Sequence, residues 1–198
     1  KVPPTDIKIS DLGDASISGD IDFSSKNADF NLLVSKFKYD DIKLKHHKFK
    51  LKYKDDLLSI SSGEPVNLFL KDKKLSIDNF FANFSSSTLI TKNLSVNYDD
   101  ILKSKVSAEY NLKNLIGVIN LHSVDIKEKN IDEFFKNDKD IKIDIKNQKE
   151  KTVISSKEYD IQYISDDNGW NLSLNSLNKI APYSKILKYY GLTNGYFS

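Results

Sequence analysis

The sequence is marked first by the residues that it lacks. Its 198 residues include no cysteine and no methionine, and all 30 basic residues are lysine. Without cysteine, a disulfide framework and a thiolate nucleophile are excluded. Without arginine, bidentate contacts to phosphate or guanine are unavailable, which argues against sequence-specific recognition of DNA. The 28 acidic residues leave a formal net charge of only +2, so we expect no nucleic-acid partner.

Long apolar runs are also missing. The longest one, residues 115–119, is far shorter than the roughly 18 residues of a membrane-spanning helix. The chain starts at Lys1 rather than at methionine, and it stops at Ser198, where an extended segment is beginning. We therefore expect a single β-rich domain over residues 1–198 that is a fragment of a longer, repeat-built protein.

Signatures of catalysis and metal binding are scarce as well. The three histidines, His46, His47 and His122, show no spacing that would place two metal ligands on one helical face. The sequence contains no glycine-rich phosphate loop and no nucleophile elbow. Residues 166–169 superficially resemble a calcium loop, but the ligand positions around them carry the wrong residues. We therefore expect no catalytic residue, no metal, no cofactor and no enzymatic activity.

Alternation of apolar and polar residues is the dominant positive feature. This pattern is typical of β-strands with one apolar face and one polar face. It recurs, with turn-forming residues between the segments, over residues 42–53, 66–70, 94–98, 106–110, 141–145, 159–163 and 170–174. The pattern predicts a mainly β fold built as an antiparallel meander. Asn168-Gly169, between two alternating segments, predicts a β-hairpin with a type I′ turn.

Two segments interrupt the alternation. Residues 130–136 begin with a capping asparagine followed by acidic residues, which predicts a short helix. Residues 176–190 combine a proline, an apolar stripe at helical spacing and a following glycine, which predicts a second helix. We expect this second helix to plug the end of the β core; the alternative is a lid or gate.

The densest charge feature is the segment 42–54, which carries six lysines. Its alternation slips by one residue at His46-His47, which predicts a β-bulge or a turn. Lys48, Lys50 and Lys52 are candidates for contact with the headgroups of anionic lipids. We favour the other interpretation, a solvated outer face whose lysines discourage edge pairing.

The apolar side of such a large sheet needs a cover. Two short helices are too few for this, so the sheet either closes on itself as a sandwich or barrel, or stays open as a trough. An open trough could hold an acyl chain without polar contacts, because each sheltered methylene contributes about 0.8 kcal/mol.

Residues 14–23, 91–98, 168–177, 182–190 and 195–197 resemble repeats of the AsmA-like and TamB-like superfamily, long envelope proteins of diderm bacteria. The resemblance lies in the overall texture of the sequence, without an invariant motif, and the heavy lysine load departs from it. It implies a sheet bent into an elongated, taco-shaped open groove, an inner-membrane anchor outside this chain, and passage of glycerophospholipid between membranes. The family has no catalytic residues to carry over.

Our leading hypothesis is therefore a periplasmic segment of an intermembrane phospholipid transporter involved in outer-membrane biogenesis. The apolar residues expected to line its groove are Ile42, Leu44, Phe49, Leu51, Leu68, Leu70, Val96, Tyr98, Ala108, Tyr110, Leu172 and Leu174. The alternative is a closed β-sandwich of an adhesin-like surface protein, which would keep the same side chains in a dry core and carry no lipid.

Overall fold

The protein is mainly β and antiparallel, as the alternation predicts. The computed structural model describes residues 1–9, 12–128, 131–148, 150–192 and 195. The chain divides into two compact units, Lys1–Asp99 and Asp100–Ser198, to which we refer as unit 1 and unit 2. None of the helices that the structure describes has the length and apolarity that crossing a bilayer requires.

Unit 1 is built from antiparallel strands only, within its described residues. They are β1 (Val2–Ile9), β2 (Gly13–Asp22), β3 (Asn27–Tyr39), β4 (Ile42–Leu44), β5 (His47–Lys54), β6 (Leu57–Ser61), β7 (Val66–Leu70), β8 (Lys73–Asp78), β9 (Phe81–Ser85) and β10 (Thr88–Tyr98). Strands β1, β2 and β3 are neighbours. Beyond β3 the sheet continues as two rows of short strands, β5, β6 and β9 in one and β4, β7 and β8 in the other. The long strand β10 pairs with the last strand of both rows.

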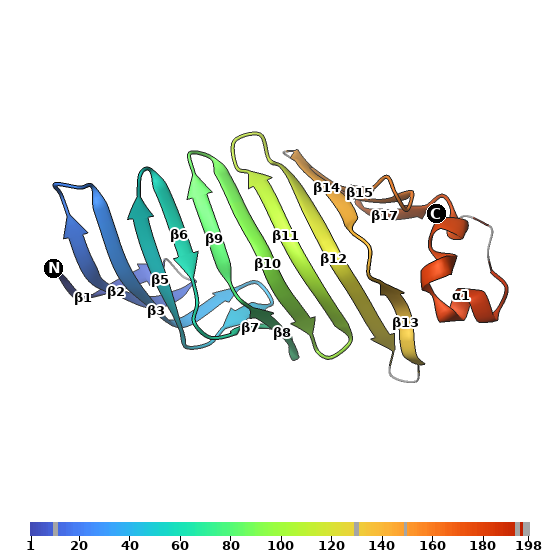
Figure 1. Cartoon of the computed structure of the whole chain (residues 1–198), viewed down its shortest axis with the longest axis horizontal. Coiled ribbons are helices and arrows are strands. Elements are labelled where there is room, and N and C mark those ends of the chain that lie inside the picture. The colour runs from blue at the N-terminus through green and yellow to red at the C-terminus, as the bar shows by residue number, and fades with distance from the viewer. Residues whose placement is uncertain (10–11, 129–130, 149, 193–194, 196–198) are drawn as a thin grey trace. The chain divides into compact units, whose positions relative to one another are not determined.

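A line of interrupted pairing separates the two rows, and we refer to it as the crease of unit 1. Cross-strand partners stop and resume between Asp14 and Ala15, Val34 and Phe37, Leu44 and His47, Ser61 and Val66, Asp78 and Phe81, and Thr91 and Ser95. In Figure 1, β7 and β8 turn away from the direction of β5, β6 and β9. The sheet is therefore bent along the crease, as a groove requires.

The core of unit 1 lies on the inside of this bend. Ala15, Val34, Leu44 and Val66 form its buried cluster, and partly buried residues such as Phe49 pack around them. Apolar side chains further from the crease are less covered: Leu70 is 41% exposed and Tyr53 is 38% exposed. Apolar side chains are thus buried along the crease, whereas those on the inner face at a distance from the crease remain accessible to solvent.

The predicted irregularity at His46-His47 is neither a bulge nor a turn. Val34 of β3 pairs with His47, and Phe37 of β3 pairs with Leu44. Two residues on each side of the ladder are therefore left without a cross-strand partner. Because the number is equal on both sides, the alternation of inward and outward side chains shifts on both strands at once, and neither has an extra residue. Leu44 and His47 are consequently both buried.

Unit 2 repeats the same construction and ends in helical turns. Its strands are β11 (Leu102–Asn111), β12 (Ile116–Glu128), β13 (Ile131–Asn137), β14 (Ile141–Gln148), β15 (Lys151–Ser156), β16 (Ile161–Asp166) and β17 (Gly169–Leu174). One half of β12 pairs with β14 and the other half with β13, and β14 to β17 follow as hairpins. The crease of unit 2 runs through the register shift at Lys105/Val106 and the gap between Asn137 and Ile141.

The predicted helix over residues 130–136 is wrong. Residues Ile131–Asn137 form β13, and Asn130 lies outside the described residues. Phe135 is paired with Ile126 of β12, so this segment extends an existing ladder. Pairing and burial against a neighbouring strand override the local helix signals of a short segment.

The second helix prediction is confirmed as helical, but in three short pieces. These are the 3₁₀ turns η1 (Leu177–Lys179) and η2 (Ala181–Tyr183) and the helix α1 (Lys185–Tyr189). Gly191 follows α1 with a φ of 65°, the left-handed conformation expected at a helix end. The predicted stripe does not form one buried face, because Tyr190 is 69% exposed. Instead, Ile180 and Tyr183 pack on the core of unit 2, as a plug would.

The predicted hairpin after β16 is confirmed, but its turn type is wrong. Asp166 pairs directly with Gly169, so Asp167 and Asn168 form the turn. Gly169 follows the turn with a φ of 132° instead of occupying it. The Asp166 carboxylate accepts a hydrogen bond from the backbone N–H of Asn168 at 2.8 Å, which fixes the turn from within.

The buried imidazole of His47 predicts a pH dependence of stability. Burial, reinforced by nearby His46 and opposed by Glu64, lowers the pKa of His47 from its ordinary value of 6.5. Between that value and the lower folded-state pKa, the unfolded chain binds more protons, so stability falls as the pH drops through this window. We expect the urea midpoint of the chain to decrease from pH 7.5 towards pH 5.5 and His47→Gln to reduce this slope. His46→Gln, at the exposed neighbouring position, is the control and should retain most of the dependence of the urea midpoint on pH. An equal dependence on pH in the wild type, His47→Gln and His46→Gln would contradict the role of His47.

Candidate apolar binding surface and cavity

Cross-strand register assembles the predicted groove residues into rows on the inner face of each unit. In unit 1, one row runs from Leu44 through Leu68 and Leu75 to Tyr98. Val66, Ile77 and Val96 form the next row. In unit 2 the corresponding rows are Ala108–Ile119–Ile143, Tyr110–Gly117–Ile145, Tyr163–Leu172 and Ile161–Leu174. The alternation of each strand is therefore a reliable guide to the face on which a residue lies.

The twelve predicted groove residues differ in their accessibility. Leu44 is buried inside the crease. Ile42, Leu70 and Leu172 are 37%, 41% and 38% exposed. The remaining residues, Phe49, Leu51, Leu68, Val96, Tyr98, Ala108, Tyr110 and Leu174, are half-buried. Most of this surface is thus neither a dry core nor an ordinary solvated face.

The inner face of unit 2 contains an apolar cavity of about 320 Å³. Its walls come from β12, β13, β14, β15 and β16, and from Ile180 in the plug. None of the residues described as lining it is charged. The polar groups of the lining are the hydroxyls of Ser155, Ser156, Tyr159 and Tyr163. The volume lies at the lower end of the range of small-molecule sites, about 300 to 1,000 Å³.

Two buried polar residues are bonded to each other beside this cavity, and one of them, Tyr159, helps to line it. Asn137 is 2% exposed and Tyr159 is 3% exposed. The Asn137 side-chain amide donates to the Tyr159 hydroxyl at 2.6 Å, and its oxygen accepts from the backbone N–H of Lys139 at 2.8 Å. Burial and nearby Tyr183 raise the pKa of Tyr159 above its usual range, so the phenol stays protonated. The pair therefore connects the end of β13 to the turn before β16 without a buried charge.

None of the residues described as lining this cavity is among the twelve predicted groove residues. Ile141, Ile143, Ile161 and Tyr163 lie in segments whose alternation was recognised, so that signal could have included them. Ile180 could not have been found in this way, because only the folding of the plug onto β13 brings it to the cavity.

The predicted headgroup lysines, Lys48, Lys50 and Lys52, alternate along β5 with its apolar residues. Lys48 and Lys50 help to line a second cavity of about 510 Å³ in unit 1, together with Ser16, Ser18 and Asn31. Lys52 forms an ion pair with Asp29 at 3.5 Å, in which both side chains are more than two-thirds exposed. Phe49 of the same strand also lines this cavity, so charged and apolar residues border it together.

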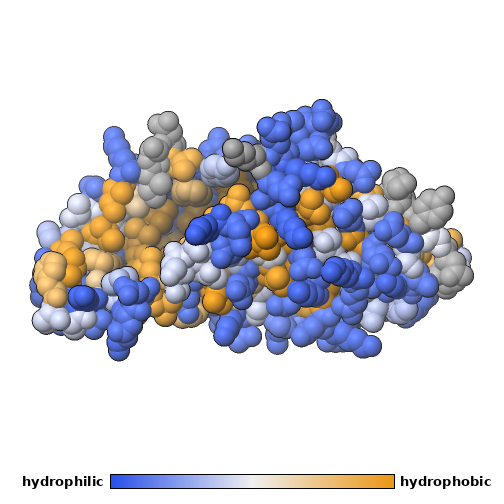
Figure 2. All heavy atoms as spheres, turned by 90° about the horizontal axis from the view of Figure 1, so that it is seen from above, coloured by the Kyte–Doolittle hydropathy of each residue, from blue (hydrophilic) through white to orange (hydrophobic). Residues whose placement is uncertain are grey.

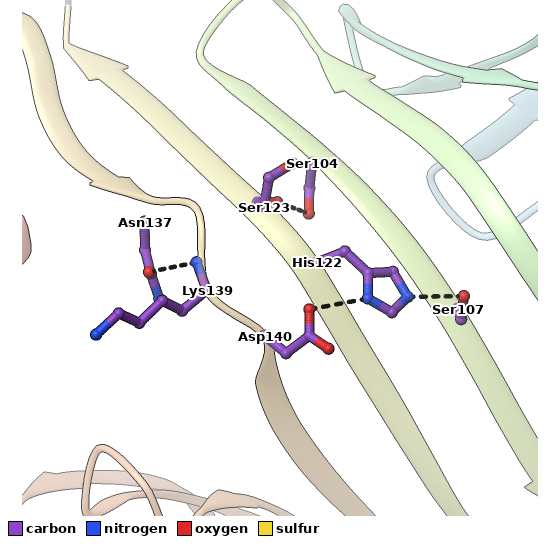
Figure 3. Close-up of polar contacts among 7 residues, drawn as sticks. All are labelled: Ser104, Ser107, His122, Ser123, Asn137, Lys139 and Asp140. Atoms are coloured by element: carbon purple, nitrogen blue, oxygen red, sulfur yellow. Dashed lines mark hydrogen bonds and ion pairs between the residues drawn. The ribbon is translucent and has the colours of Figure 1, made fainter.

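A Ser–His–Asp arrangement lies on the outer face of unit 2 (Figure 3). The Ser107 hydroxyl lies 2.9 Å from His122 Nε2, and His122 Nδ1 lies 3.0 Å from a carboxylate oxygen of Asp140. These contacts have the connectivity of a hydrolase triad. Acyl transfer also needs oxyanion donors and a substrate pocket, and neither cavity described above is lined by these three residues. The arrangement instead joins β11, β12 and the link between β13 and β14 at the crease.

The Asn137–Tyr159 pair generates a stability prediction. Tyr159→Phe removes the hydroxyl and leaves a buried amide donor without its partner, which costs about 1 to 3 kcal/mol. We expect urea unfolding to show a loss of this size. Tyr53→Phe is the matched control, because it removes a hydrogen bond to Asp56 of 2.7 Å at an exposed site and should change little. Equal effects of the two substitutions would show that the buried pair does not stabilise unit 2.

Within the described residues, no group of three or more His, Asp or Glu side chains is arranged to hold a metal ion. A scan of protein-family models and searches of curated proteins and of solved structures return no match to this chain.

Proposed function

We propose that the inner apolar faces of the two units bind acyl chains, and that the chain acts as a periplasmic segment of a protein that transports phospholipid between the membranes of a diderm cell envelope. The observation that carries the proposal is the incomplete cover of these faces. The expectation from sequence, a lipid groove lined by alternate residues, supplies the transport context.

The solvent-accessible area of the chain is larger than expected for two compact domains of the same total mass. The chain exposes 13693 Å². Two separate compact domains of half its mass would together expose about 11,500 Å². The excess surface supports a sheet whose inner face is only partly covered by its own chain.

The exposed surface is also apolar in character. Among the described residues, 17 large hydrophobic side chains are exposed, whereas only 10 hydrophobic residues are buried. Figure 2 shows apolar side chains gathered in a hollow over unit 1, with hydrophilic side chains around it. Such concentrations on a protein surface mark binding sites for apolar ligands or partners.

Acyl chains suit this surface because binding them needs no specific polar partner. Each methylene removed from water contributes about 0.8 kcal/mol, so a chain of a dozen carbons could be held by half-buried side chains alone. A closed adhesin-like sandwich is the competing function, and it predicts that the same side chains exclude every ligand.

Lipid recovery tests the proposal directly. The 198-residue chain should be purified without detergent from bacteria and examined by native mass spectrometry and by organic extraction. We expect phospholipid to remain bound and to be recovered in a defined ratio to protein. A monodisperse, folded protein that is free of lipid, and that takes up none from phospholipid vesicles, would overturn the proposal.

A charge placed on the inner face separates an open surface from a closed core. Ala108→Asp introduces a carboxylate beside Ile119 on this face. If the face is open, the carboxylate stays hydrated, the free energy of unfolding changes by about 1 kcal/mol or less, and lipid binding falls roughly tenfold or more. Lys105→Asp changes an exposed residue on the same strand and should leave lipid binding intact. Unfolding of the Ala108→Asp protein would instead indicate a closed core.

A further inference from the structure

One buried hydroxyl at the cavity of unit 2 has no partner. Ser156 is 5% exposed, lines the cavity, and its Oγ makes no hydrogen bond with any described residue. Other buried serines of unit 2 are satisfied. Ser104 donates to the backbone oxygen of Ser123 at 2.7 Å, and Ser184 accepts from the N–H of Leu187 at 3.3 Å.

An unpartnered buried hydroxyl is unfavourable and uncommon in folded proteins, where buried polar groups are nearly always paired. Ser156 stands opposite Ile161 in the cross-strand register, so its neighbour on β16 offers only an apolar side chain. The hydroxyl of Tyr159, another lining residue, already bonds with the Asn137 amide and with Tyr183. A group that enters the cavity is therefore the natural partner of Ser156 Oγ.

The lining restricts the chemistry of that group. A serine hydroxyl can both donate and accept a hydrogen bond, so it suits a hydroxyl or a carbonyl oxygen. None of the described lining residues is charged, so an ionised headgroup would be buried without a counter-ion, which is strongly unfavourable. The partner of Ser156 is thus an uncharged oxygen group attached to an apolar body.

The volume restricts the size of the ligand. An apolar cavity of about 150 Å³ accommodates benzene, so 320 Å³ suits roughly a dozen non-hydrogen atoms. Ile180 in the plug forms part of the wall, and another lining residue, Phe134, is 41% exposed. These dimensions fit one aliphatic chain.

We propose that the unit 2 cavity is a site for a single aliphatic chain and that Ser156 selects chains carrying an uncharged hydroxyl or carbonyl oxygen. The inference rests on the proposed function in treating the inner face as lipid-binding. It adds a discrete site of defined capacity and polarity at the plugged end of unit 2.

The chain carries its own reporter for this site. Trp170 is its only tryptophan, and its ring stacks on Tyr163, a lining residue, with 6.4 Å between the ring centroids. Ligand entry should therefore alter tryptophan fluorescence. The probes are 1-decanol and undecane, which have the same number of non-hydrogen atoms and differ in one oxygen. A shift in melting temperature provides a second readout.

Three variants of the 198-residue chain complete the experiment. We expect Ser156→Ala to weaken decanol binding about fivefold, the effect of losing one neutral hydrogen bond, and to leave undecane binding unchanged. Ser173→Ala is the matched control, since its hydroxyl donates to the Gln162 backbone oxygen away from the lining. Ile154→Phe fills the cavity and should weaken both probes; melting curves identify the variants that remain folded.

The outcomes separate this site from the general lipid surface. The role of Ser156 would be overturned if the folded wild-type chain bound decanol and undecane with equal affinity and if Ser156→Ala changed neither affinity. Recovery of phospholipid without any response to either probe would overturn the cavity site and leave the proposed function intact. Decanol binding with the expected serine dependence, in a chain that carries no phospholipid, would support the site and contradict phospholipid transport.

Discussion

The structure depends on satisfying the backbone groups that are released where strand pairing stops. In unit 1, Ser62 Oγ donates to the backbone oxygen of Glu64 at 2.6 Å, accepts from its N–H at 3.2 Å, and contacts His47 Nε2 at 2.7 Å. In unit 2, Asn137 and Ser104 bond to backbone groups at the crease. Because each unsatisfied buried group costs about 1 to 3 kcal/mol, the partly buried bonds of Ser104 and Asn137 stabilise the bend of unit 2, whereas the bonds between Ser62 and Glu64 lie at an exposed site.

The bend decides where burial is available. Side chains on the inside of each crease become core, whereas equivalent side chains further along the same strands stay half-covered. In unit 1 both sides of the crease are strands, so the inner face remains wide. In unit 2 the helical turns pack on β13, and Ile180 adds a wall to an apolar cavity of the inner face that remains partly open. The same bent-sheet construction therefore yields an open surface in one unit and a bounded site in the other.

Because alternate residues of a strand point to opposite faces, the charged side chains and the apolar side chains lie mainly on different faces of each sheet. Lysines and acids on the outer phase form exposed ion pairs, such as Lys52 with Asp29 at 3.5 Å. Such pairs are weak and serve mainly solubility. The inner phase carries mainly aliphatic and aromatic side chains and a few buried hydroxyls, together with Lys73, which stands opposite Leu70 and over the ring of Tyr98. The proposed binding of acyl chains rests on the apolar side chains of this phase.

The sequence by itself determined the mainly β character and the face on which many residues of each strand lie, because side-chain alternation is a local property of an extended backbone. It was correct for the rows through Leu68, Val96 and Ala108. It failed at residues 131–137, where pairing with β12 prevailed over helix signals, and at His46-His47, where the irregularity is shared by two strands. Only the tertiary structure decided where the sheet bends, which inner residues are buried and that Ser156 lacks a partner. These properties depend on contacts between segments far apart in the chain, which no local pattern encodes.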